Sequence, residues 1–169
     1  MKHLPLHRSI ANLLFALTAL FALAGLLPVS ASAGTLTKQL VNVDKNGVAL
    51  QGYDPVGFYT EGKPVKGLAT ISSQYKGATY HFASKANRAS FNSKPGKYEP
   101  MYGGFCAFGV CKGKMAAVDV SAFKIMDGRL MMMHDAKARA AFDQDAERNR
   151  ELADRRWRGF SFGNGGTIQ

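Results

Sequence analysis

Hydrophobic and polar residues alternate in short runs along most of this chain, which is the pattern of half-buried β-strands. The alternation predicts strands at residues 40–43, 69–75 and 79–82. The last two are separated by Lys76-Gly77-Ala78, so we expect them to form a hairpin. Asp44-Lys45-Asn46-Gly47 follows the first strand and predicts a turn, because an Asn-Gly pair readily adopts positive φ.

A second hairpin is predicted in the C-terminal third of the chain. Residues 122–126 and 129–133 are short apolar runs on either side of Asp127-Gly128, a strong signal for a two-residue turn. Asp135 then stands in an N-cap position before a long helical pattern, which we expect to run from Ala136 to Trp157.

Two shorter helices are predicted between these regions. Asp54 precedes Pro55, so we expect Asp54 to cap a short helix in which proline occupies the first position. Ser84 is the expected cap of a second helix over residues 85–92, with Phe91 facing inward. Together the elements predict an α+β domain with a small antiparallel sheet built from hairpins, short helices and one long C-terminal helix.

Residues 1–33 have the features of an export signal. A basic start is followed by an uncharged apolar run from Ile10 to Leu27, and Ala31-Ser32-Ala33 matches the small-residue pattern that a signal peptidase cleaves. The alternative is an uncleaved membrane anchor, which the cleavage pattern disfavours. We therefore expect a periplasmic or secreted protein with no transmembrane span after cleavage.

The remaining chain has the length of one domain, expected at residues 34–158, followed by a flexible Gly-rich tail at 159–169. Removal of Lys2 and Arg8 with the signal lowers the net charge from +10 to +8. The basic residues are spread along the chain, and the densest patch, residues 155–158, lies near the end of the predicted helix, where cations are favoured. This distribution, in an exported protein, argues against nucleic acid as a partner.

Several segments, in order, resemble the YHS domain family. They are residues 52–56 (GYDPV), 75–84 (YKGATYHFAS), Phe91, 95–98 (PGKY) and, for the longer, exported branch of the family, 102–108 (YGGFCAF). The resemblance implies a small α+β module with a suspected role in binding metals. The family occurs alone and fused to metal-transport ATPases and oxygenases.

This sequence departs from the family pattern at the positions that carry thiols. Short YHS domains often have cysteines just after DPV, after the hairpin and in the following helix. Gly57, Ala83 and Asn87 occupy those places here. If this protein binds a metal, it must therefore use other groups.

The two cysteines, Cys106 and Cys111, are the first candidates for those groups. Five residues of regular helix would turn the two side chains about 140° apart, so a shared ligand or a disulfide requires a break, which Gly109 permits. Three interpretations remain open: a metal or redox site, a disulfide, or buried unpaired thiols.

His81 and His134 are the other candidate ligands. His81 lies in the second strand of the first predicted hairpin. A lone histidine is more often structural than a ligand. His134 ends the run Met131-Met132-Met133, and in a strand Met132 and His134 share one face. Thioether, imidazole and thiolate ligands together suit Cu(I). The alternative is that the methionines fill an irregular core.

The sequence therefore predicts an exported module that binds a soft metal ion, copper first and zinc second, through Cys106, Cys111, His81 and His134. Its role would be sequestration of the ion or delivery to a metal transporter or metalloenzyme. The alternatives are a thiol–disulfide redox protein, which needs an exposed cysteine, and a disulfide-stapled structural or interaction module. No pattern of catalytic residues is present, so no catalytic role is assigned.

Overall fold

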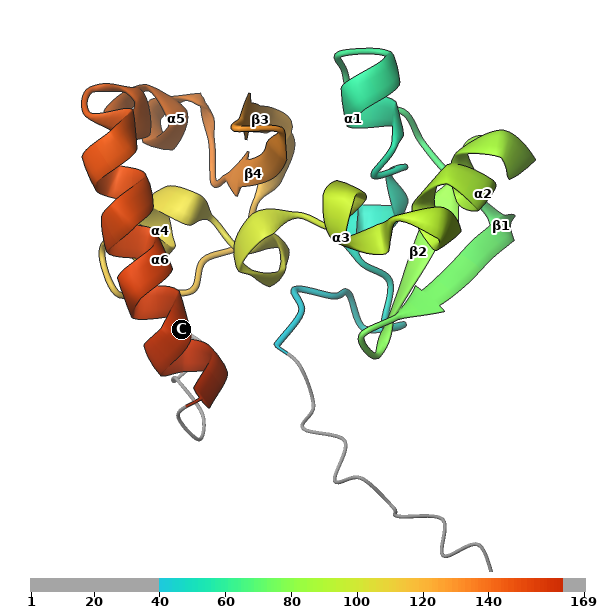
Figure 1. Cartoon of the computed structure of the whole chain (residues 1–169), viewed down its shortest axis with the longest axis horizontal. Coiled ribbons are helices and arrows are strands. Elements are labelled where there is room, and N and C mark those ends of the chain that lie inside the picture. The colour runs from blue at the N-terminus through green and yellow to red at the C-terminus, as the bar shows by residue number, and fades with distance from the viewer. Residues whose placement is uncertain (1–39, 163–169) are drawn as a thin grey trace, which may run out of the picture. The chain divides into compact units, whose positions relative to one another are not determined.

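The structure, a computed structural model, describes residues 40–162 (Figure 1), all of which belong to one unit. The predicted signal peptide and residues 163–169 lie outside the described residues. Two antiparallel hairpins, six α-helices and two short 3-10 helices (Leu50–Gly52 and Met101–Gly104) make up the described fold, which confirms the α+β class. Each hairpin is a two-stranded sheet of its own, so the expected small sheet is divided in two.

The first hairpin pairs β1 (Leu68–Tyr75) with β2 (Ala78–Phe82) around the turn Lys76-Gly77. Lys76 adopts a positive φ of 51° and Gly77 one of 78°, the conformation of a tight hairpin turn. Alternate residues of β2, namely Ala78, Tyr80 and Phe82, are buried. They pack against Phe91 of α2 (Lys85–Ser93), whose N-cap Ser84 accepts a hydrogen bond from Asn87 N at 3.0 Å.

The segment before this hairpin differs from the prediction. Residues 40–43 do not form a strand, because the Asn42 N–H donates to Gly103 O at 2.8 Å instead of to a neighbouring strand. Only Val43 forms a bridge, with Ala49, across the predicted turn. The predicted first helix is reduced to α1 (Gly57–Thr60).

The second hairpin pairs β3 (Asp119–Met126) with β4 (Arg129–Met133), and its turn is the predicted Asp127-Gly128. Strand β4 lies between two hydrophobic cores. Leu130 and Met132 belong to the core that contains β2 and α2, whereas Met131 and Met133 belong to a core formed with the C-terminal helices. All three methionines are fully buried, as side chains that fill a core would be.

The C-terminal helical region is divided where one helix was expected. The helix predicted over residues 136–157 is interrupted at Gln144-Asp145, giving α5 (Ala136–Asp143) and α6 (Ala146–Phe162). Asp145 causes the restart, because its carboxylate and its carbonyl accept the Arg148 and Asn149 N–H groups at 3.4 and 2.9 Å. Helix α6 also continues through the first four residues of the predicted flexible tail.

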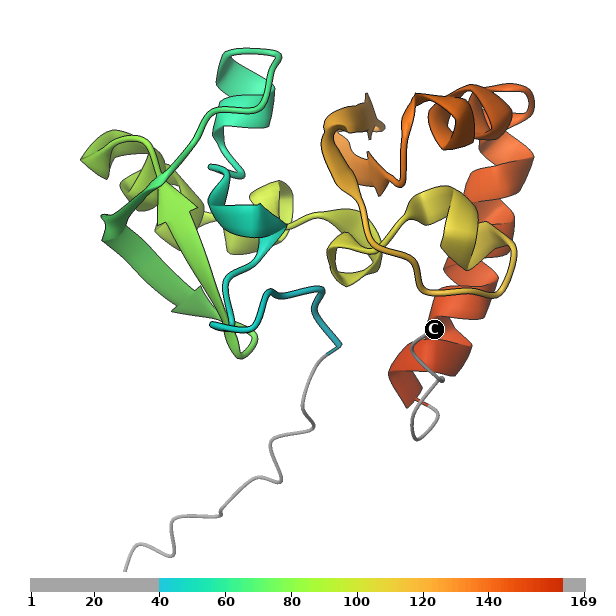
Figure 2. The same ribbon diagram turned by 180° about the vertical axis from the view of Figure 1, so that it is seen from behind.

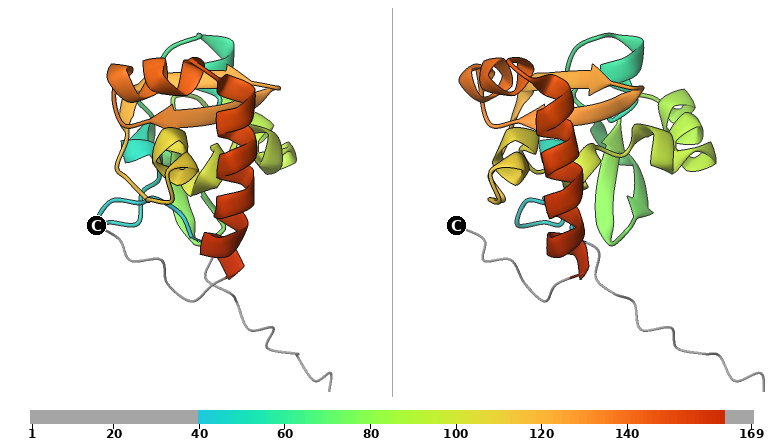
Figure 3. Two further views of the ribbon diagram at one scale, coloured as in Figure 1. Left: turned by 90° about the vertical axis from the view of Figure 1, so that its left-hand side faces the viewer. Right: turned by 60° about the vertical axis from the view of Figure 1, so that its left-hand side comes forward.

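The remaining short helices connect the two hairpins. Helix α3 (Pro95–Tyr98) follows α2, and α4 (Ala107–Cys111) packs along α6 (Figure 2). Helix α5 contacts both strands of the second hairpin (Figure 3). Across residues 40–162, no helix combines the length and the apolar character that a bilayer crossing requires.

Candidate functional site

Asp54 is the most buried charged residue of the described chain, with no exposed surface. Its carboxylate accepts hydrogen bonds from Val56 N at 2.8 Å, Gly57 N at 3.4 Å, Ala83 N at 2.8 Å and Asn87 Nδ2 at 2.7 Å. Helix α1 starts at Gly57 with Val56 as its N-cap, two residues later than predicted, so Asp54 is not the N-cap residue. Its carboxylate instead joins the turn before α1 to the end of β2 and to α2. A buried carboxylate with four donors is stabilised in place and has little capacity for a further ligand.

Three of these four donors stand at the positions where short YHS domains often have cysteines. Gly57, Ala83 and Asn87 are far apart in the sequence, and the fold brings them together around one carboxylate. Gly57 and Ala83 donate through backbone N–H groups, and Asn87 donates through its side-chain amide. Hydrogen bonds to Asp54 therefore occupy the positions where the resemblance implies thiolate ligands.

Cys106 is the N-cap residue of α4 and is 2% exposed. Its Sγ accepts hydrogen bonds from Gly109 N at 3.3 Å and from His134 N at 3.2 Å. Cys106 also forms an isolated parallel bridge with Met132 of β4, which places the thiol beside the end of that strand.

Cys111, the last residue of α4, has a different environment. It is fully buried in the second core, and its Sγ donates to Asn149 Oδ1 of α6 at 3.2 Å. The Asn149 amide in turn donates to Phe142 O of α5 at 3.0 Å. The Cys111 thiol is thus part of a chain of hydrogen bonds that joins three helices.

Helix α4 continues through Gly109 without a break, and the two cysteines are free thiols with separate partners. The disulfide that the sequence left open is not formed. Both thiols are buried. A thiol–disulfide redox protein needs an accessible thiol, so this arrangement does not favour the redox interpretation.

The two candidate histidines lie in different places. His81 alternates with the buried residues of β2, so it faces away from the core that contains Cys106, and it packs closely against Gly52 and Gly67. His134 is exposed and lies next to Cys106, and its Nδ1 is 2.9 Å from Ala117 O. Since a carbonyl only accepts, Nδ1 carries the proton and Nε2 keeps a free lone pair in the neutral ring. Among residues 40–162, no three His, Cys, Asp or Glu side chains converge as a metal site.

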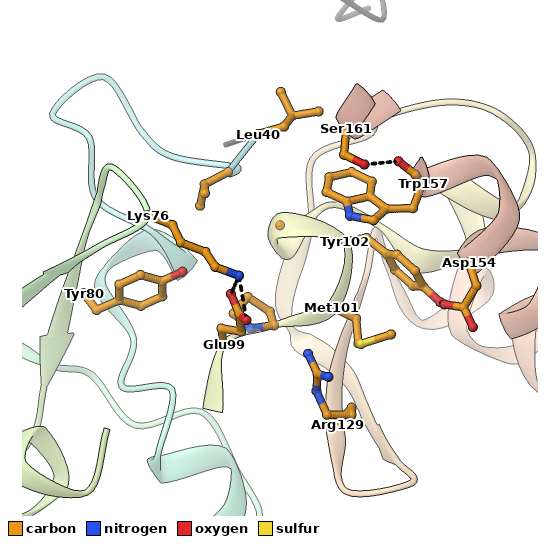
Figure 4. Close-up of a pocket in the computed structure, with 13 residues that line it drawn as sticks. Leu40, Lys76, Tyr80, Glu99, Met101, Tyr102, Arg129, Asp154, Trp157 and Ser161 are labelled. Carbon is orange, nitrogen blue, oxygen red and sulfur yellow. Dashed lines mark hydrogen bonds and ion pairs between the residues drawn. The ribbon is translucent and has the colours of Figure 1, made fainter. Parts of the chain in front are cut away.

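Sequence reasoning missed a cleft of about 490 Å³ beside residues 101–104, here called the glycine-rich segment (Figure 4). One wall carries Lys76 and Tyr80 of the first hairpin, and the other carries Tyr102 and Trp157. Arg129, the first residue of β4, also lines it. The signals available in the sequence were the single tryptophan of the chain and the Tyr-Gly-Gly triplet at 102–104.

The two cleft tyrosines have perturbed phenols. Burial raises the pKa of Tyr102 well above its usual range, and the neighbouring Asp154 carboxylate, 2.9 Å from the phenol oxygen, raises it further. Burial also raises the pKa of Tyr80, with Glu99 adding to the effect. Both phenols therefore stay protonated at neutral pH and can serve as hydrogen-bond donors.

The glycines beside Tyr102 have a structural explanation. Gly103 has a φ of 58°, and a Cβ at this position would come within 2.1 Å of Leu40 O. The backbones of Leu40 and Gly103 therefore approach so closely that only glycine fits at position 103. Tyr102 itself has a φ of 55°, an uncommon conformation for a bulky residue, and its phenol is held by the hydrogen bond to Asp154.

A comparison with known families agrees with the resemblance found in the sequence. The model of the YHS domain matches residues 56–102, from the residue after Pro55 to the start of the glycine-rich segment. No curated protein and no solved structure matches the chain. This protein therefore carries a YHS domain over residues 56–102. The match ends before both cysteines, so they lie outside the matched segment.

Proposed function

We propose that this protein is an exported YHS module that binds a soft metal ion, Cu(I), through Cys106, Met132 and His134. The observation that carries the proposal is the position of Cys106, which is bridged to Met132 and accepts the His134 N–H on its Sγ at 3.2 Å. Met132 and His134 are two residues apart at the end of β4. The backbones of Met132 and His134 therefore lie beside the Cys106 thiol, and we propose that the thioether and the imidazole of these residues complete the site.

The donor types favour copper over zinc. Zinc sites use three or four Cys, His or carboxylate ligands, and no such group converges within residues 40–162. Cu(I) accepts thioether sulfur and needs fewer ligands. The choice of copper thus follows from the chemistry of the side chains available next to Cys106.

The surroundings of the two side chains support a ligand role. The Nδ1–H of His134 donates to a backbone carbonyl, an orientation common for metal-binding histidines, and this leaves Nε2 available. Two backbone N–H groups point at the Cys106 sulfur, and such hydrogen bonds also stabilise a metal-bound thiolate. His134 is exposed and offers the ion a first contact from solvent.

Cys111 and His81 are not part of the proposed site. The Cys111 thiol is used as a donor to Asn149, and His81 faces away from the core of Cys106. We propose sequestration of the ion, or its delivery to a metal transporter or metalloenzyme, as the role in the periplasm or outside the cell. With so few ligands the ion would remain exchangeable.

The test is anaerobic titration of the reduced protein with Cu(I) against a chromogenic Cu(I) chelator. We expect one Cu(I) per chain and a loss of at least tenfold in affinity in Cys106→Ser and in His134→Ala. Cys111→Ser is the matched control, because it removes the only other thiol and should leave the affinity unchanged. Equal effects of the two serine variants, or no competition with the chelator, would overturn the proposal.

A further inference from the structure

The cleft beside the glycine-rich segment has the size of a small-molecule site. Its volume of about 490 Å³ falls in the range of pockets that hold small organic ligands. It lies between the first hairpin on one side and α6 on the other, and Met101 and Arg129 line it between these walls (Figure 4). None of these residues belongs to the proposed copper site.

The acidic groups of the cleft already have partners. Glu99, the residue after α3, forms an ion pair at 2.8 Å with Lys76 of the first hairpin turn. Asp154 accepts from Tyr102 at 2.9 Å and from Arg150 at 3.0 Å. Within this cleft the carboxylates are thus neutralised by protein groups.

Arg129 is the exception among the charged groups of the cleft. Its Nε is buried and has no hydrogen-bond partner among the described residues, and no carboxylate in that part of the chain lies within ion-pair distance of its guanidinium. In Figure 4 the guanidinium points toward the space between Glu99 and Met101. A buried donor without a partner is costly and requires an explanation. A planar guanidinium fork matches a carboxylate or phosphate.

The opposite wall is aromatic and firmly held. The rings of Tyr102 and Trp157 lie 6.0 Å apart, and Trp157 also packs against Phe105 and Phe160 at 6.4 Å each. Tyr102 is fixed by its hydrogen bond to Asp154 and by the strained backbone at its own position. Such a wall offers a preformed surface for a flat apolar group.

We propose that this cleft binds a small organic anion, with its carboxylate or phosphate on Arg129 and its flat apolar body against Tyr102 and Trp157. The anion supplies the acceptor that Arg129 Nε lacks. The proposal is independent of the copper site, because the two use different residues. Binding of the anion therefore survives the loss of Cys106 or His134.

The single tryptophan of the chain makes the test specific, because Trp157 gives the only indole N–H resonance in a ¹H–¹⁵N spectrum. The protein is titrated with 2-naphthoate and with the neutral 2-naphthamide, which has the same shape. We expect 2-naphthoate to shift the Trp157 resonance in a saturable manner, at least tenfold more tightly than the amide. A titration with 2-naphthyl phosphate compares a phosphate head group with the carboxylate of 2-naphthoate. Tighter binding of 2-naphthyl phosphate assigns the site to phosphates, and weaker binding assigns it to carboxylates.

Variants then assign the charge selectivity to one residue. Arg129→Gln should weaken 2-naphthoate binding at least tenfold and leave 2-naphthamide nearly unaffected. Arg148→Gln, an exposed arginine on α6 outside the cleft, is the matched control and should change neither. Equal binding of the acid and the amide to the unaltered protein would overturn the proposal, and that comparison requires no variant to fold. Absence of any saturable Trp157 shift would overturn it as well.

Discussion

Asp54 and Arg129 are charged side chains that differ in burial and in hydrogen bonding. Asp54 is fully buried, and four N–H groups donate to its carboxylate. Arg129 is half-buried at the edge of a cleft, and its Nε has no partner among the described residues. The comparison indicates that a charge whose hydrogen bonds are complete stabilises the fold, whereas a charge with an unpaired donor is available to a ligand.

The largest expected effect is the loss of Asp54. Asp54→Ala would leave several buried donors without an acceptor, so we expect the free energy of unfolding to fall by about 3 to 5 kcal/mol. Urea unfolding followed by far-UV circular dichroism measures the change. Asp44→Ala is the control, because Asp44 accepts two backbone N–H groups in an exposed turn where water can replace it. A similar loss in both variants would contradict the structural role of Asp54.

A smaller loss is expected for a single donor of the same network. Asn87→Ala removes the amide that donates to Asp54 at 2.7 Å and should lower the free energy of unfolding by about 2 kcal/mol. Asn92→Ala is the control for helix propensity. It replaces an exposed asparagine of the same helix, so any gain in stability from alanine itself should be the same in both variants. Equal stability of the two variants would show that the Asn87 hydrogen bond contributes nothing.

The two tyrosines that line the cleft, Tyr80 and Tyr102, predict a loss of stability at alkaline pH. Because the pKa of Tyr102 and that of Tyr80 are raised by folding, the folded state holds these protons more tightly than the unfolded state. The resulting stabilisation is complete below about pH 10, the unfolded value, and is lost as the pH rises through the folded value. The double variant Tyr80→Phe/Tyr102→Phe should show a shallower decline in urea midpoint above pH 10. An unchanged decline would mean that these phenols do not cause it.

The smallest expected effect on stability is that of Arg129. Arg129→Met keeps an apolar stem and removes the unpaired donor, so the free energy of unfolding should stay unchanged or rise by about 1 kcal/mol. The same urea experiment measures it, and the sign is opposite to that expected for Asp54→Ala. A loss comparable to that of Asn87→Ala would mean that Arg129 has a structural partner in the folded protein and would remove the contrast between the two regions.

The elements that were predicted correctly are those specified by neighbouring residues. Ser84 caps α2, and turns connect the expected strands at Asp127-Gly128, as predicted, and at Lys76-Gly77, one residue shorter than predicted. The alternation in Met131-Met132-Met133 also placed Met132 on the face opposite to its two neighbours. Each of these features depends on backbone preferences within a few positions, which the sequence carries directly.

Two predictions failed, one because of a distant contact and one because of a local cap that competes with helix continuation. The expected strand at residues 40–43 is absent because Asn42 pairs with the backbone of Gly103, 61 residues away in the chain. The expected single C-terminal helix is interrupted because Asp145 caps a new one. A helix-forming pattern could continue through this point, and a competing cap is hard to weigh from sequence alone.

The candidate site shows the same division. The sequence by itself determined which side chains can bind a soft ion, because thiol, thioether and imidazole chemistry belongs to the residue types. Only the tertiary structure separated Cys106 from Cys111, and only packing brought Gly57, Ala83 and Asn87 around Asp54. The cleft lined by Arg129, Tyr102 and Trp157 was likewise not predicted from the sequence. Whether a polar group is paired depends on neighbours that only the folded chain supplies, and that pairing distinguishes Asp54 from Arg129.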